Sequence, residues 1–172
     1  MATLERQPGI GSTRWALDGE QPPLRAWRVS RFPALWLYFE RAPFRPDPAR
    51  SAEWNRGAYL VNHLAHCGEC HTPRNALGAP KRALLFAGAP DIEGGIAPNI
   101  TPDEETGIGK WSESAIVEML KSGLLPDGDT VGGAMTDVVN HGTSHLNDAD
   151  LKAMAVYLKS LPAIRNKVEK KK

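Results

Sequence analysis

The only two cysteines of the chain stand three residues apart, in the segment His-Cys-Gly-Glu-Cys-His at residues 66–71. Two thiols at this spacing can add across the two vinyl groups of a haem, and the histidine that follows can bind the iron. This chemistry assigns Cys67 and Cys70 to thioether bonds and His71 to the proximal iron ligand. The segment therefore predicts one covalently attached haem c.

Three other chemistries use the same pair of cysteines. A thioredoxin-like redox pair is typical of a strand-to-helix junction in a βαβ pattern, which this chain does not display. A structural zinc site would need two histidines besides the cysteines, taken from His63, His66, His71, His141 and His145. A disulfide across two residues would be strained and would leave the histidine without a role.

A haem iron held by His71 leaves its sixth position to be filled. Met119 and Met154 fall at core-like spacing in helical patterns, whereas Met135 lies in a loop-like stretch after two glycines. We therefore predict Met135 as the sixth ligand and place it in a loop. Two alternatives stay open: Met135 fills a gap in the core, or His141 or His145 takes the position.

Composition limits the classes of protein. The 172 residues carry a formal charge of +1 and 41% apolar residues, which suits one modest soluble domain with an extension. Near-neutral charge argues against a nucleic-acid partner. The sequence lacks an apolar run of about 20 residues and an N-terminal signal peptide, yet covalent haem implies assembly outside the cytoplasm. We expect a periplasmic protein, at the outer face of the inner membrane.

Three regions follow one another along the chain. Residues 1–50 hold seven of the 14 prolines and read as a Pro-rich arm or connector. Its apolar stretch 32–39 should pack on the main domain or meet a partner, with insertion at a membrane surface as a weaker third option. Residues 51–165 form the predicted single-haem domain, and 166–172 a basic tail.

Helical periodicity appears three times within 51–165. Ser51 is the expected N-cap of the first helix, whose buried face includes Leu64, and Ser112 caps a second that ends near Ser122. Asn147 opens a third, which stops at Pro162. Residues 72–109 are rich in glycine and proline and predict a long loop that a ligand must organise. The predicted fold is all-α, with this loop wrapped over the haem.

The order of these elements resembles the class I cytochromes c, in which the first and last helices cross closely and the axial methionine arrives from a loop before the last helix. Gly57 and Tyr157 match the small and aromatic residues of that crossing. The resemblance implies a class I cytochrome c fold with a Pro-rich N-terminal extension.

A narrower resemblance covers most of the chain. The segments 44–48, 54–61, 66–74, 98–103, 107–111 and 150–162 are similar to the cytochrome c subunits of membrane-bound bacterial alcohol, gluconate and sorbitol dehydrogenases. Those relatives carry three haem motifs, and this chain has one. It is therefore either one module of a larger subunit or a single-haem relative.

These resemblances imply roles for further residues. The carbonyl of Pro98 is expected to hold the second ring nitrogen of His71. Donors to the haem propionates would come from Arg74, Asn99, Thr101 and Trp111, each of which has an equal alternative as a turn or surface residue.

The implied function is the transfer of single electrons, without catalysis by the chain itself. The donor would be a dehydrogenase subunit or an upstream haem. The acceptor would be a quinone site, an oxidase or a soluble carrier, with peripheral membrane association through a partner or the arm. The alternatives are a haem-based sensor or peroxidase-like protein with a labile sixth ligand, and a zinc-stabilised structural domain.

Overall fold

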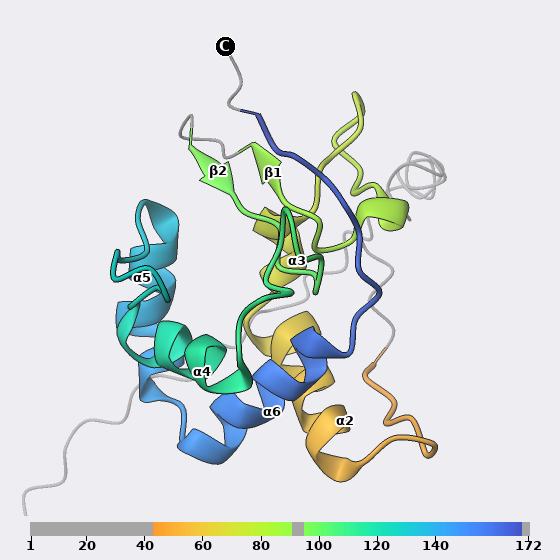
Figure 1. Ribbon diagram of the computed structural model, residues 1–172. Coiled ribbons are helices and arrows are strands. Elements are labelled where there is room, and N and C mark those ends of the chain that lie inside the picture. Colours follow the sequence, from red (N-terminus) through yellow and green to blue (C-terminus); the bar gives the residue numbers. More distant parts are fainter. Residues whose placement is uncertain (1–42, 91–94, 170–172) are drawn as a thin grey trace, which may run out of the picture. The chain divides into compact units, whose positions relative to one another are not determined.

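The computed structural model describes residues 43–90 and 95–169, all within one compact unit that runs from Arg41 to Lys172. The arm before residue 43, including the apolar stretch 32–39, lies outside the described residues. Figure 1 shows the elements. They are α2 (Ala52–Tyr59), the π-helix η2 (Leu60–Leu64), α3 (Cys67–His71), the 3-10 helix η3 (Arg82–Leu84), β1 (Ala89–Pro90), β2 (Ile96–Ala97), α4 (Glu113–Ser122), α5 (Ala134–His141), the 3-10 helix η4 (Thr143–His145) and α6 (Asp148–Lys159).

The three predicted helices begin at their predicted caps. The hydroxyl of Ser51 accepts a hydrogen bond from the backbone N–H of Trp54 at 3.1 Å, and Ser112 caps α4 in the same way. The amide oxygen of Asn147 caps α6 at 2.8 Å. These bonds satisfy N–H groups that a helix start leaves without partners. Local sequence therefore fixes where the main helices start.

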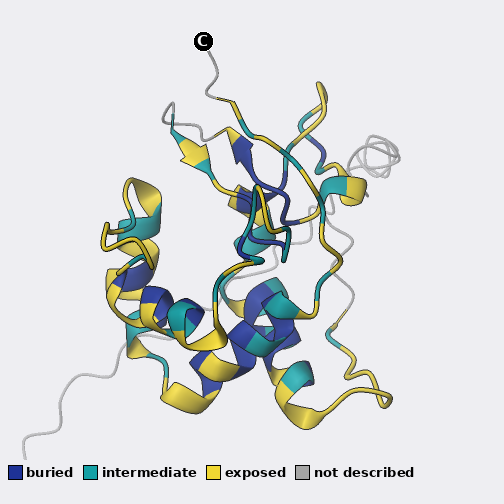
Figure 2. Cartoon of the chain, in the orientation of Figure 1, coloured by how far each residue is buried: buried dark blue, intermediate teal, exposed yellow. Residues whose placement is uncertain are grey.

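Helices α2 and α6 cross at Gly57. A Cβ atom at this position would lie 1.9 Å from the carbonyl oxygen of Ala153, so only glycine allows this approach. The rings of Trp54 and Tyr157 meet edge to face beside it, with centroids 5.1 Å apart. The crossing expected from Gly57 and Tyr157 is present. Figure 2 shows that the buried residues concentrate around it.

The core is formed by α2, α4 and α6, and it takes up Met119 and Met154, as predicted. Leu64 was predicted to lie on the buried face of the first helix, but 54% of it is exposed. The helix widens at this point, because the N–H of Ala65 bonds to the carbonyl of Leu60, five residues back. The wider turn rotates Leu64 away from the core.

The region 72–109 is mostly irregular, as expected, but it is not free of strands. Two-residue strands β1 and β2 pair antiparallel, with Ala89 opposite Ala97. The fold is therefore mostly helical rather than purely helical.

Helix α5 was not predicted. It begins after Gly133, which has a positive φ of 58° and provides no side-chain cap. The second residue of this helix is Met135, so the prediction that Met135 lies in a loop is wrong. Two glycines before a short apolar run suggested a loop, but the segment packs on α4 and gains its helical stability from that contact.

The chain after α6 runs back past α3 toward β1 and β2, as Figure 1 shows. We call residues 163–168 the C-terminal strap. The side chain of Asn166 donates to the carbonyl of Ala87 at 2.9 Å. The residue after the predicted domain boundary at 165 thus still contacts the domain. In the described part of the chain, no helix combines the length and the apolar content needed to cross a bilayer.

Candidate functional site

The two cysteines and His71 share the short helix α3. The chain enters it through His66, which adopts a left-handed conformation with a φ of 51°. Cys67 and Cys70 stand three residues apart, a spacing that places two side chains next to each other on one face of a helix. Their thiols are free. The helix thus presents two thiols together, next to a buried imidazole.

The imidazole of His71 has a defined orientation. Its Nδ1 lies 2.7 Å from the carbonyl oxygen of Pro98, so the hydrogen bond expected between these residues is present. A carbonyl can only accept, and Nδ1 must therefore carry the hydrogen. Burial lowers the pKa of His71, against the opposing effect of the Pro98 carbonyl. The ring is thus held neutral, with the lone pair on Nε2 available to a metal.

The Cys67 thiol differs from the reactive thiol of a redox dithiol. Burial raises the pKa of the Cys67 thiol to about 11, whereas reactive cysteines in redox pairs have lowered pKa values. The structure thus argues against the thioredoxin-like alternative. It also contains no disulfide between the two cysteines.

The zinc alternative finds no geometric support. All the cysteines and histidines considered for it lie in the described residues. Within those residues, no three side chains of His, Cys, Asp or Glu come close enough together to hold a metal ion.

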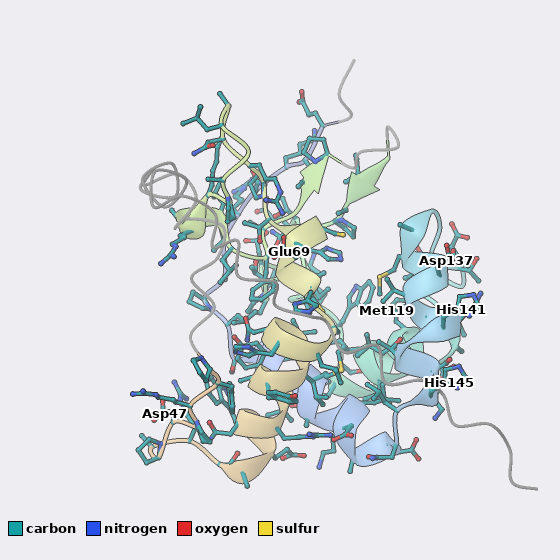
Figure 3. All side chains as sticks on the ribbon, turned by 180° about the vertical axis from the view of Figure 1, so that it is seen from behind. Asp47, Glu69, Met119, Asp137, His141 and His145 are labelled. Atoms are coloured by element: carbon teal, nitrogen blue, oxygen red, sulfur yellow. The ribbon has the colours of Figure 1, made fainter. Side chains whose placement is uncertain are left out.

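Among the methionines of the described residues, Met135 differs from the other two. Met119 and Met154 belong to the buried core, with exposed fractions of 9% and 0%, whereas Met135 is only partly buried against that core. Met135 is therefore the methionine whose side chain the core does not enclose in the described residues. The histidines considered for the same role are exposed. Figure 3 shows His145 on η4, away from Glu69 of α3, whereas His141 of α5 also lines a groove between the end of η2 and α5.

The four residues expected to meet the propionates occupy different environments. Arg74 is exposed and forms an ion pair with Glu69 of α3 at 2.6 Å. Asn99 and Thr101 are buried, with exposed fractions of 3% and 1%. Trp111 is partly buried against the core.

Hydrogen bonds inside the protein use the donors of two of these residues. The amide of Asn99 donates to Thr106 Oγ1 at 2.9 Å and to the carbonyl oxygen of Ile164 at 2.7 Å. The hydroxyl of Thr101 donates to Asn99 Oδ1 at 2.8 Å. These bonds favour the alternative that Asn99 and Thr101 are turn-forming residues of the loop. Arg74 and Trp111 keep the predicted role as a hypothesis.

Sequence reasoning missed the contacts that hold the backbone around His71. The N–H of Gly88 donates to the carbonyl of His71 at 2.8 Å. The hydroxyl of Thr72 accepts from the N–H of Phe86 at 3.1 Å, and Phe86 is fully buried with a positive φ of 64°. The glycine-rich composition of 72–109 signalled a shaped loop but did not indicate these pairs.

Exposed apolar side chains lie near the CxxCH segment, residues 67–71, in two places. Leu64 and Val138 are exposed by 54% and 40%, and they line an apolar groove of about 430 Å³ between the end of η2 and α5. Leu85 is 41% exposed and approaches Gly68 of α3. A large apolar group attached at Cys67 and Cys70 would cover such surface. Two adjacent thiols, a neutral imidazole with a free Nε2 and nearby apolar side chains together fit haem c.

Residues 54–162 match the family described as Cytochrome c. The chain belongs to the cytochrome c family. Membership implies covalent haem c, in agreement with the geometry of α3.

Curated relatives are cytochrome subunits of bacterial dehydrogenases and related cytochromes. The chain is 45% identical to the fructose dehydrogenase cytochrome subunit of Gluconobacter japonicus, over 72% of this chain and 25% of that protein. It is 41% identical to the cytochrome c subunit of the alcohol dehydrogenase (quinone) of Gluconobacter oxydans, over 95% of this chain and 33% of that subunit. It is 52% identical to a diheme cytochrome c-type protein of Cereibacter sphaeroides, over 65% of this chain and 36% of that protein. The chain thus spans between a quarter and about a third of the length of these relatives.

Proposed function

We propose that this cytochrome c chain carries one haem c and passes single electrons from a dehydrogenase subunit, or from another haem, to a respiratory acceptor. The observation that carries the proposal is the hydrogen bond from His71 Nδ1 to the Pro98 carbonyl, which leaves Nε2 free. When bound, haem c supplies one-electron exchange between ferric and ferrous iron.

The chain itself would attach and orient the cofactor. Cys67 and Cys70 would hold it through thioether bonds, so that it cannot dissociate. His71 would bind the iron on one side. The partly buried thioether of Met135 would bind on the other side, which favours the ferrous state and leaves no position for oxygen chemistry. This ligand pair supports an electron carrier over a sensor or peroxidase-like protein.

The names of the relatives support a dehydrogenase partner. Those whose names state a complex are subunits of fructose, alcohol, gluconate and nicotinate dehydrogenases. We infer that this chain receives electrons in a comparable dehydrogenase complex. Its acceptor would be a quinone site, an oxidase or a soluble carrier at the periplasmic face of the inner membrane. The chain contains one CxxCH segment, which supports one haem per 172 residues within a class I cytochrome c fold.

An absorption spectrum of the reduced and oxidised protein tests this assignment. Full-length chain should be produced with the haem-attachment machinery. We expect a low-spin ferrous spectrum and, in the ferric state, the weak red-end band of methionine bound to iron. A high-spin spectrum that changes on addition of cyanide or carbon monoxide would instead support the sensor or peroxidase-like alternative. Colourless protein that retains zinc would support the structural domain.

A further inference from the structure

The C-terminal strap lies beyond the residues that match the family, which end at 162, yet it contacts both sides of the loop that surrounds His71. Its hydrogen bonds connect it to His71 along two routes. One route leads to the imidazole ring, and the other leads to the backbone of His71.

The first route leads to the imidazole ring of His71. The carbonyl of Pro98 accepts from His71 Nδ1 at 2.7 Å. The next residue, Asn99, is 3% exposed, and its amide donates to the carbonyl oxygen of Ile164 in the strap at 2.7 Å. The N–H of Ile164 donates in return to the hydroxyl of Thr101 at 3.1 Å. The strap therefore fixes the residues directly after Pro98 through a reciprocal pair of bonds.

The second route leads to the backbone of His71. The N–H of Gly88 donates to the carbonyl of His71 at 2.8 Å. The side-chain amide of Asn166 donates to the carbonyl oxygen of Ala87, the residue before Gly88, at 2.9 Å. Val168 packs directly on Gly88, because a Cβ at that glycine would lie 2.7 Å from Val168 Cγ2. Both segments that touch His71 are thus bound to the strap.

We propose that the C-terminal strap is a positioning element for His71, acting through Asn166 and Ile164 on the two segments that hold the histidine. The hydrogen bond from a ligating imidazole to an outer carbonyl sets the orientation of the ring and its basicity as a ligand. Because the strap anchors the residues on both sides of that contact, it sets how closely Pro98 and His71 approach. The inference rests on the proposed role of His71 as an iron ligand.

Asn166→Ala in the full-length, haem-bearing chain tests the proposal. The variant removes the side-chain anchor on Ala87 and keeps the backbone bond of residue 166 to Thr106. We expect the midpoint potential to rise, because a shift of the 87–88 segment moves the His71 backbone, weakens the bond from Nδ1 to Pro98 and makes the imidazole a poorer donor to ferric iron. We also expect the paramagnetically shifted proton NMR signals of the His71 ring to move. Asn166→Gln, which keeps an amide, should restore part of both changes.

Asn55→Ala is the matched control. Asn55 is buried and Asn166 is partly buried, and each ties an irregular segment to the fold. Asn55 does so through hydrogen bonds with Asp47, Arg50 and Ser51. Its loss should lower stability without moving the potential or the ring signals. A haem-bearing Asn166→Ala protein with the potential and ring signals of the parent, or a shift equal to that of the control, would overturn the strap proposal alone. A parent chain without covalent haem would overturn the proposed function instead.

Discussion

At His71, burial and one carbonyl group together select the form of the imidazole. Burial favours the neutral ring, and the Pro98 carbonyl places the remaining hydrogen on Nδ1. The carbonyl was predicted from the sequence only through the resemblance to a family, because no local rule links residues 27 positions apart. The structure explains the link through the loop that returns residue 98 to α3.

Met135→Leu separates the proposed role of Met135 as an iron ligand from its role in packing. Replacement by leucine keeps an apolar side chain of similar size, so the packing contribution to stability should change by less than about 1.5 kcal/mol. Loss of the thioether should lower the midpoint potential and let imidazole or cyanide bind the iron. Redox titration and absorption spectra with added ligand would measure both effects.

Met119→Leu and Met154→Leu are the controls for Met135→Leu. Both methionines lie in the core, and their replacement should leave the potential and the spectrum unchanged. If Met135→Leu retains the parental spectrum, the sixth ligand must be another residue, such as His141 or His145.

The ion pair between Arg56 and Asp150 predicts a pH-dependent contribution to stability. Arg56 Nε lies 2.7 Å and Nη2 2.9 Å from the two carboxylate oxygens. The hydrogen bond with Arg56 lowers the pKa of Asp150 from its ordinary value of 3.8. The pair therefore stabilises the fold above the unfolded-state pKa, and this contribution is lost as the pH falls through the lower folded-state value.

Asp150→Asn should cost about 1 kcal/mol at neutral pH, because the guanidinium is half exposed and solvent weakens the pair. The difference from the parent should vanish once the pH is below the folded-state pKa of Asp150. Urea unfolding at a series of pH values would show this. Asp148→Asn, in the same first turn of α6 but 92% exposed, should show a smaller difference. Equal losses for the two variants would contradict the assigned role of the pair.

Among the elements, those with local signals were predictable and those made by tertiary contacts were not. Ser51, Ser112 and Asn147 each mark a helix start that the structure contains. Helix α5 lacks such a cap, and the π-helical turn after Tyr59 has no sequence signature. Asn99 was recognised as a residue of suitable chemistry, but its partner Ile164 is 65 positions away. Pairing over such a distance depends on the folded chain.

The crossing of α2 and α6 depends on the absence of a side chain at Gly57. Gly57→Ala should destabilise the protein by about 3 kcal/mol, because the new methyl group would overlap the Ala153 carbonyl. The intrinsic helix preference of alanine, about 1 kcal/mol, acts in the opposite direction and is smaller. Urea unfolding of the haem-bearing protein would measure the loss.

Gly132→Ala serves as the comparison for Gly57→Ala, since nothing lies within 4 Å of a Cβ at Gly132. Its effect should stay within about 0.5 kcal/mol. A tolerated alanine at Gly57 would mean that the two helices do not approach as closely as described.

At the scale of the whole molecule, a few short helices and a long irregular loop share one modest core. A covalently held porphyrin would add apolar area that the short helices cannot supply, which would account for the mostly irregular backbone of 72–90 and 95–109. The fructose and alcohol dehydrogenase subunits are three to four times as long as the part that this chain matches.

The intact mass of the denatured full-length chain, produced with the haem-attachment machinery, tests the central claim most directly. A Cys67→Ser/Cys70→Ser chain made in the same way provides the control, since it can form no thioether. The account predicts that the parent gains the mass of one haem and that the control has the mass of the polypeptide alone. A parent chain with the bare polypeptide mass would contradict it.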